Sequence, residues 1–336
     1  MSDGSPRRRF GLPPPEVLFA FAALGLVLLF GSLFNANGVF FQPAVHADAL
    51  WQIAGFGILA CGLTIVILAG GIDLSVGSVV ALSGVIFTIA SIREELPPVV
   101  SFGLAIAAGT GCGFLNGVMV AHLRLQPFIA TLAMMAFARG LAKSSLLSGG
   151  VKIQRMPPPS EIEILNAKLD LAGLHVSLGT CIFLACFLAT FVALRHFRFG
   201  RHVYAIGDNA QAAWLSGVPV KRTVVWAYTA CGLLAGIAGV LFAGLERQGN
   251  PDGGAGYELT AIAMVVVGGT SLSGGRGGVT LTLLGALTIG YVRKILDLNG
   301  IATPAQHMIT GGIIVVAVLV PKLLSRGLLH RDPGRP

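Results

Sequence analysis

Residues 49–69 read ALWQIAGFGILACGLTIVILA and are followed at 70–78 by GGIDLSVGS. The first stretch carries no charged side chain and is long enough to cross the hydrocarbon core of a bilayer as a helix. The second stretch places a glycine pair and an acidic residue directly before another apolar run. The two together predict a membrane helix, a polar break and a second membrane helix.

Similar apolar runs recur from end to end. We place ten of them, at Val17–Phe34, Ala49–Ala69, Val76–Ile92, Pro98–Ala121, Pro127–Leu147, Val176–Leu194, Thr223–Leu245, Leu259–Leu272, Val279–Leu296 and Gln306–Leu324. The chain is 54% hydrophobic and 11% charged, whereas soluble domains carry about 25% charged residues. We therefore predict an all-α, polytopic membrane protein of about ten helices. A single domain over residues 17–324 lies between tails at 1–16 and 325–336.

Basic residues predict the orientation, because cytoplasmic loops carry the excess of Lys and Arg. With the N-terminus inside, the inner side holds most of the cations and the outer side only Arg93, Lys152, Arg155, Lys168 and Arg247. Both termini are then cytoplasmic. This distribution also accounts for the net charge of +8 without a nucleic-acid partner. Arg7–Arg9 resemble the start of an export signal, but the many later spans favour a first membrane helix.

A short pattern occurs twice, in which glycines lead to an acid, a leucine and a hydroxyl residue. It reads GGIDLS at 70–75 and GGAGYELT at 253–260. An inverted repeat of five plus five helices would produce such spacing, with the third and eighth segments as half-helices. With so few matching letters, chance explains the pattern equally simply.

Two acids stand out because an ionisable side chain in a membrane segment is costly and often functional. Asp73 precedes the third segment and has two equally supported interpretations, a helix cap or a group on the transport pathway. Glu258 opens the eighth segment after a polar loop with Asn250 and Asp252, and could meet a ligand or form a solvated cap.

Several enzyme classes are excluded by missing motifs. The glycine-rich run at 268–278 looks like a phosphate loop but lacks the Gly-Lys pair, which occurs nowhere in the chain. No zinc-ligand spacing or nucleophile elbow is present, and the five cysteines lie in apolar stretches. We expect no catalytic residue, metal or cofactor on this chain, so any nucleotide hydrolysis belongs to another polypeptide.

Seven stretches within residues 50–320 resemble the permease subunit of ribose-type ABC importers, which carry monosaccharides. They are GIDLSVGS at 71–78, QPFIATL at 126–132, GRHVYAIGDN at 200–209, AAWLSG at 212–217, CGLLA at 231–235, GYELTAIA at 256–263 and GGTSL at 268–272. The resemblance implies a location in the bacterial inner membrane and three kinds of partner. These are a second permease copy, cytoplasmic ATP-binding subunits and a periplasmic sugar-binding protein.

The resemblance also implies that the inner stretch 195–222 couples the permease to the ATPase. The family's Glu-Ala-Ala-x-x-x-Gly segment here begins with Gln211, which puts an ion pair with the ATPase in doubt. A second departure is Thr260, where relatives often carry Asp, and we therefore expect a shifted substrate preference. The expected coupling residues are Tyr204, Gly207, Asn209, Gln211, Ala212, Ala213 and Gly217.

Transport of a neutral sugar or polyol by alternating access needs a pathway lined by hydrogen-bonding and aromatic side chains. We expect this pathway to include Asp73, Ser75, Asn116, Gln126, Phe128, Thr131, Glu258, Thr270 and Ser271. The rival interpretation is an ion- or proton-coupled secondary transporter. It calls for a chain of buried acids, of which only Asp73 is a clear candidate.

Overall fold

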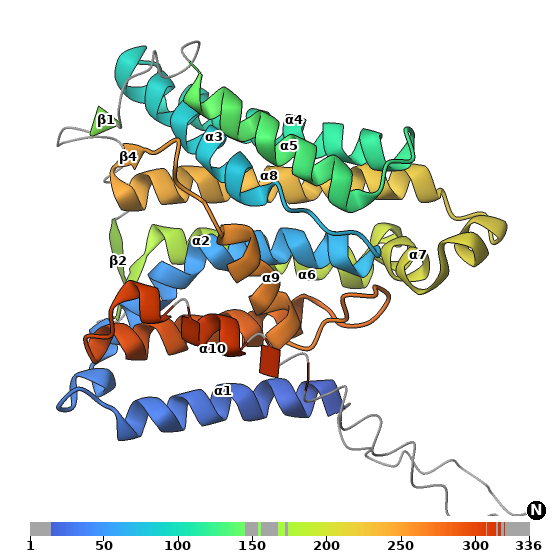
Figure 1. The fold of residues 1–336 in the computed structure, drawn as a ribbon. Coiled ribbons are helices and arrows are strands. Elements are labelled where there is room, and N and C mark those ends of the chain that lie inside the picture. Colours follow the sequence, from blue (N-terminus) through green and yellow to red (C-terminus); the bar gives the residue numbers. More distant parts are fainter. Residues whose placement is uncertain are drawn as a thin grey trace, which may run out of the picture.

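The fold is that of a helical bundle, seen in a computed structural model that describes residues 15–144, 154–155, 167–171, 174–306, 308–313, 315–316 and 319 (Figure 1). The expected N-terminal tail, apart from its last two residues, and the whole expected C-terminal tail at 325–336 lie outside this part of the chain. All the residues that we predicted to serve transport or coupling lie within it.

Ten helices are bounded within the described residues, and further helical residues recur between 303 and 319. Prolines open α2, α4 and α5, where the missing N–H costs no helical hydrogen bond. The helices are α1 (Pro15–Leu33), α2 (Pro43–Leu68), α3 (Val76–Thr88), α4 (Pro98–Ala121), α5 (Pro127–Lys143), α6 (Leu178–His196), α7 (Arg198–Leu215), α8 (Val220–Glu246), α9 (Tyr257–Val267) and α10 (Val279–Leu298). A short 3-10 helix, η1 (Val39–Phe41), precedes α2, and a π-helix, η2 (Ile89–Arg93), prolongs α3.

Six of the described helices are long and apolar enough to cross a membrane, and the shorter apolar helices Val17–Leu33 and Tyr257–Val267 add to them. The prediction of an all-α polytopic membrane protein is thus confirmed. The predicted number of ten membrane crossings is not established by these six helices. The third segment, predicted as Val76–Ile92, agrees with the structure within one residue, because η2 continues α3 to Arg93. The eighth is shorter than predicted, because α9 ends at Val267 before the glycine pair 268–269.

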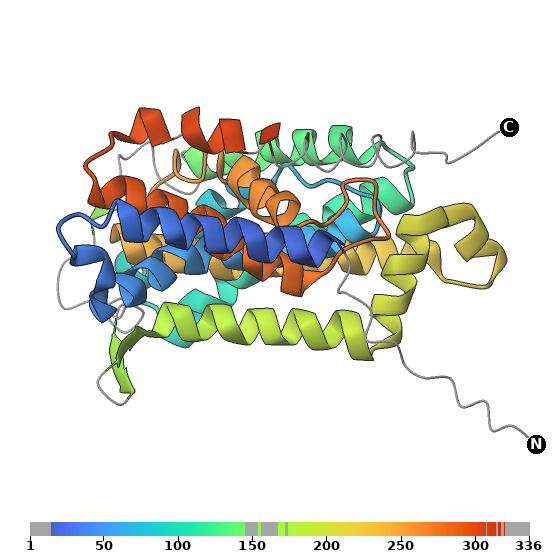
Figure 2. The same cartoon turned by 90° about the horizontal axis from the view of Figure 1, so that it is seen from below.

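Small strands also occur, and they lie outside the predicted apolar runs except for Val176 and Ser177 at the end of β3. β1 (Gln154–Arg155) pairs antiparallel with β4 (Gln248–Gly249), and β2 (Lys168–Leu171) pairs antiparallel with β3 (Leu174–Ser177). The strands lie at one end of the bundle, and α7 lies beyond the other end (Figures 1 and 2). These two ends are called the strand end and the α7 end below.

The core is built around α8, which packs along α2, α3 and α4. Helices α4 and α8 approach closely because glycines face each other at the crossing, so that a Cβ at Gly113 would lie 2.3 Å from the Tyr228 carbonyl oxygen. Helix α2 is mostly buried inside the bundle, whereas α4 and α6 leave most of their surface outside. A helix enclosed by others can carry the breaks and polar groups that a lipid-facing helix cannot.

Several helical pairs are joined by irregular chain instead of a tight turn, and two of these connections lie against α7. Residues 69–75 connect α2 to α3, and residues 268–278 connect α9 to α10. Non-helical backbone within a membrane protein is stable only where protein or water satisfies its polar groups. These two connections are therefore the natural places to look for a functional site.

Candidate functional site

The connection between α2 and α3 is held by a chain of buried polar side chains. Asp73 is 1% exposed, and its Oδ1 accepts hydrogen bonds from the backbone N–H of Ser75 (2.9 Å) and from Ser75 Oγ (2.6 Å). Ser75 Oγ in turn accepts a hydrogen bond from Asn116 Nδ2 on α4 (2.9 Å). Asp73 thus organises the start of α3, and Asn116 ties that start to α4.

The carbonyl oxygen of Ile72 is held from two further helices. Tyr228 on α8 donates its hydroxyl hydrogen to it at 3.3 Å, and Thr131 on α5 approaches it at 3.5 Å. Both side chains are buried. We did not predict a role for Tyr228 from the sequence, although a tyrosine inside an otherwise apolar span indicates that a polar partner is close.

The start of α3, just after the first stretch of the repeated pattern, meets the second stretch in space. A Cβ at Gly77 would lie 2.2 Å from the Gly254 carbonyl oxygen and 2.3 Å from Glu258 Oε2, and a Cβ at Gly254 would lie 2.1 Å from the Gly77 carbonyl oxygen. Only glycine permits this approach of two backbones. The start of α3 and the start of α9 therefore form one junction, which carries Asp73 on one side and the half-buried Glu258 on the other.

The loop before α9 is fastened to α5 at the strand end. Arg139 Nη1 donates to the carbonyl oxygens of Pro251 (2.7 Å) and Gly253, and Lys143 forms an ion pair with Asp252. The hydrogen bond from Lys143 holds the pKa of the exposed Asp252 carboxyl below its usual range. The loop that leads to Glu258 is in this way fixed relative to the α3–α5 side of the bundle.

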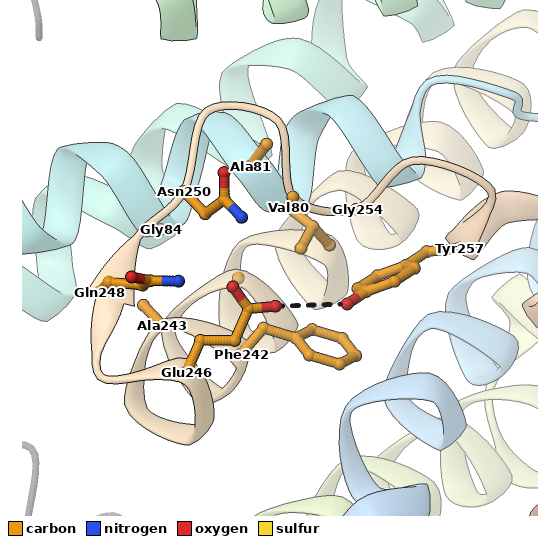
Figure 3. Close-up of a pocket in the computed structure, with 12 residues that line it drawn as sticks. Val80, Ala81, Gly84, Phe242, Ala243, Glu246, Gln248, Asn250, Gly254 and Tyr257 are labelled. Carbon is orange, nitrogen blue, oxygen red and sulfur yellow. Dashed lines mark hydrogen bonds between the residues drawn. The ribbon is translucent and has the colours of Figure 1, made fainter. Parts of the chain in front are cut away.

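A small depression, with room for little more than a water molecule, lies beside this junction between α3, α8 and the loop before α9 (Figure 3). Tyr257 and Glu246 face each other across it, and the Tyr257 hydroxyl donates to Glu246 Oε1 at 3.4 Å. Asn250 and Gln248 also line it, and Phe242 packs against Tyr257 with ring centroids 4.6 Å apart. Aromatic faces beside polar groups are the side chains that a sugar needs, but in this arrangement of the helices the depression is too small to hold one.

The remaining expected pathway residues lie elsewhere. Gln126 and Phe128 are exposed at the start of α5. Thr270 and Ser271 shape the turn before α10, where Thr270 Oγ1 accepts from the Gly278 N–H (3.2 Å) and the Ser271 N–H donates to the Arg276 carbonyl (3.0 Å). The structure thus brings together Asp73, Ser75, Asn116, Thr131 and Glu258, and leaves these four apart from them.

The expected coupling stretch 195–222 contains α7, which is two helical segments separated at Asn209 (φ −156°, ψ 103°). Asn209 Oδ1 accepts from the Ala212 N–H at 2.9 Å and so caps the second segment. Gln211 and Ala212 are exposed, Ala213 is buried, and Gly217 ends the helix with a φ of +82°. Trp214 and Leu215 are 66% and 72% exposed on this segment.

The first segment of α7 is joined to both irregular connections. A Cβ at Gly207 would lie 1.9 Å from the Leu68 carbonyl oxygen, which also accepts a hydrogen bond from the Gly275 N–H at 3.0 Å. Tyr204 donates its hydroxyl hydrogen to the Gly277 carbonyl at 3.0 Å. A displacement of α7 must therefore act on the end of α2 and on the turn before α10 together.

Within the described residues, no group of three or more His, Cys, Asp or Glu side chains is placed to hold a metal ion. The ionisable groups at the junction of α3 and α9 serve hydrogen bonding and packing. The arrangement therefore offers polar contacts between helices. Such contacts can bind a solute and can transmit the movement of one helix to another.

Comparison with known proteins gives a consistent result. A family described as branched-chain amino acid transport system / permease component matches residues 46–318. The ribose import permease protein of Escherichia coli (strain K12) is 36% identical over 304 residues, covering 88% of this chain and 91% of that protein.

Two further relatives agree with this match. The ribose import permease protein of Bacillus subtilis (strain 168) is 38% identical over 302 residues, covering 90% of this chain and 92% of that protein. The fructose import permease protein of Rhizobium meliloti is 34% identical over 314 residues, covering 91% and 86%. No solved structure gave a significant match.

Proposed function

Because the chain belongs to the family of branched-chain amino acid transport system permease components, we propose that it forms the membrane pathway of an ATP-driven importer for a monosaccharide. The observation that carries this proposal is the similarity, over most of the chain, to import permeases named for ribose and fructose. The chain is a transport subunit and not an enzyme, and the ATPase activity lies on a separate subunit.

The proposed pathway runs past the junction of α3 and α9. Two helices that begin inside the bundle, with irregular chain before each, resemble the broken helices that form transporter sites. Asp73, Ser75, Asn116 and Thr131 hold one side of this junction, and Glu258 lies on the other. The close contact of Gly77 with Gly254 is what an inverted repeat of the two halves would produce.

In this proposal, an ATP-binding subunit docks on the second segment of α7 and moves the helices of the permease. Exposed Trp214 and Leu215 provide its apolar contact, and the break at Asn209 lets this segment pivot on the first. Gly207 and Tyr204 then pass the movement to the irregular connections. Alternating access follows if these connections have two packed arrangements.

The full assembly contains a second permease copy, two ATP-binding subunits and a periplasmic sugar-binding protein. The chain lies in the cytoplasmic membrane of a bacterium, with both termini and α7 on the cytoplasmic side, and carries no cofactor. The rival interpretation, a secondary transporter, has less support, since Asp73 is fully engaged with Ser75 instead of lying in a chain of acids.

Substitution of Trp214 tests the docking. The variant Trp214→Glu places a charge in the proposed apolar contact, and we expect at least a tenfold loss of ATPase copurifying with the tagged permease, since an unpaired charge buried in an interface costs several kcal/mol. Leu123→Glu is the matched control, because Leu123 is 65% exposed in the connection between α4 and α5 at the same end of the bundle (Figure 1). Equal loss in both variants, or none in either, contradicts the proposed docking.

A further inference from the structure

Two neighbouring cations on α10 have different surroundings. Lys294 is 9% exposed and its ammonium forms an ion pair with the Asp48 carboxylate on α2. Arg293 Nη2 instead donates to the Thr260 hydroxyl at 2.9 Å, and its guanidinium carbon lies 4.9 Å from the centre of the Phe56 ring. One charge is neutralised inside the protein, and the other rests on a neutral hydroxyl and an aromatic face.

No carboxylate lies within 4 Å of the Arg293 guanidinium among the residues that the structure describes. Asp297, one helical turn further along α10, is engaged with Gln306, whose Nε2 donates to Asp297 Oδ1 at 2.6 Å. A guanidinium has five N–H donors in a planar fork, and the Thr260 contact uses one of them. Four N–H donors of Arg293 thus lie outside the Thr260 contact and have no carboxylate partner among the described residues.

The position of Arg293 links it to the candidate site. It contacts α9 through Thr260, one turn after Tyr257 opens that helix. The Phe56 ring under the guanidinium packs against Tyr257 with centroids 4.7 Å apart, and Tyr257 lines the depression together with Glu246. The guanidinium is thus linked to the depression through Phe56 and Tyr257, although neither Arg293 nor Phe56 lines the depression itself.

Asp297 is the nearby acid but makes no ion pair with Arg293, and a half-buried cation with no carboxylate in contact is costly in a membrane protein. A bidentate contact with an oxyanion removes this cost, and arginine matches the planar geometry of a carboxylate or phosphate particularly well. We propose that Arg293, with Thr260 and the Phe56 ring, binds an oxyanion group on the transported solute, which is then a sugar acid or sugar phosphate instead of a neutral sugar. This inference rests on the proposed function and narrows its substrate class.

The test uses the complete transporter with its ATP-binding subunits and its own binding protein in proteoliposomes. ATP-driven uptake is measured for D-gluconate, D-galacturonate, D-ribose 5-phosphate and D-ribose. We expect uptake of at least one of the three oxyanion-bearing solutes, with carboxylate and phosphate sources distinguished by which is carried. Uptake of D-ribose alone, or of none of the four, overturns the inference. If the proposed function itself is wrong, no ATPase will copurify with the permease. This result is distinguishable from a failure of the oxyanion inference.

Substitutions then test whether Arg293 binds the oxyanion group of the solute. We expect Arg293→Gln to raise the KM for the oxyanion-bearing solute about tenfold or more, the range expected for losing hydrogen bonds to a charged group. Thr260→Asp keeps Arg293 but supplies an internal counter-charge, and should raise the same KM. The double variant Asp48→Asn with Lys294→Gln is the matched control and should leave the KM unchanged. An unchanged KM in Arg293→Gln or Thr260→Asp, with protein that elutes as the wild-type complex, would mean that the guanidinium serves packing only.

Discussion

At the scale of single residues, Asp73 illustrates how burial decides between two roles. Asp73 is almost fully enclosed and directs one carboxylate oxygen to the N–H and hydroxyl of Ser75. Such contacts are those of a group that shapes the start of a helix. The Ser75 hydroxyl also accepts a hydrogen bond from Asn116, so that a polar contact links α3 to α4 inside an apolar bundle.

Removal of the Asp73 carboxylate should therefore destabilise the protein. Asp73→Ala leaves the Ser75 N–H and hydroxyl without their buried acceptor, a loss of about 1–3 kcal/mol for each buried donor left unpaired. Asp73→Asn retains the acceptor oxygen and should recover most of this. The midpoint of thermal unfolding in detergent measures the effect. Asp208→Ala is the control, because Asp208 is exposed and forms no ion pair among the described residues, and an equal drop in both alanine variants would contradict the structural role of Asp73.

At the scale of elements, α7 is set apart by its contacts with the rest of the bundle. Its first segment contacts the end of α2 and the turn before α10 through backbone, with no side chain between them at Gly207. Backbone contacts of this kind transmit displacement because they leave no flexible side chain to absorb it. Its second segment lies outside the bundle with exposed apolar side chains.

Substitution of Gly207 should separate docking from transport. In Gly207→Ala the new Cβ would lie 1.9 Å from the Leu68 carbonyl oxygen, so α7 must shift away from α2. We expect the ATPase to copurify as with the wild type, while ATP-driven uptake falls at least tenfold. Gly140→Ala on α5 is the control, because nothing lies within 4 Å of the added Cβ. Normal uptake by Gly207→Ala would show that this contact does not couple the two processes.

At the scale of the whole molecule, the two ends of the bundle differ. The connection between α3 and α4 lies at the strand end, and α7 lies beyond the opposite end (Figure 1). The excess of Lys and Arg that we counted for the inner side includes the residues that flank α7. If basic loops stay in the cytoplasm, the α7 end is cytoplasmic and the strand end faces the periplasm.

Cysteine labelling in intact cells tests this orientation. On a Cys181→Ser background, Glu94→Cys in the α3–α4 connection should react with a membrane-impermeant maleimide, and Ser216→Cys should react only after the membrane is opened. Both positions are exposed, and Cys61, Cys112, Cys186 and Cys231 are buried. The reverse labelling pattern would overturn the orientation.

The local sequence was sufficient to predict most of the membrane helices and the family. Long uncharged runs predicted membrane helices because transfer of backbone into lipid requires internal hydrogen bonding over about 20 residues, and the spans follow them closely. The stretches quoted for the resemblance likewise pointed to the family that the comparisons then matched. Glycines at 268–269 also marked where α9 ends, although we drew the apolar segment past them.

Tertiary structure alone decided which distant residues meet. Hydropathy describes each segment against lipid and says nothing of which helix face meets which neighbour. The sequence therefore could not join Ser75 to Asn116, Tyr228 to Ile72, or Gly207 to Leu68. The same holds for Arg293 and Lys294, which are adjacent in sequence. They point about 100° apart around the helix, so that only packing gave one of them a carboxylate and the other a hydroxyl and an aromatic ring.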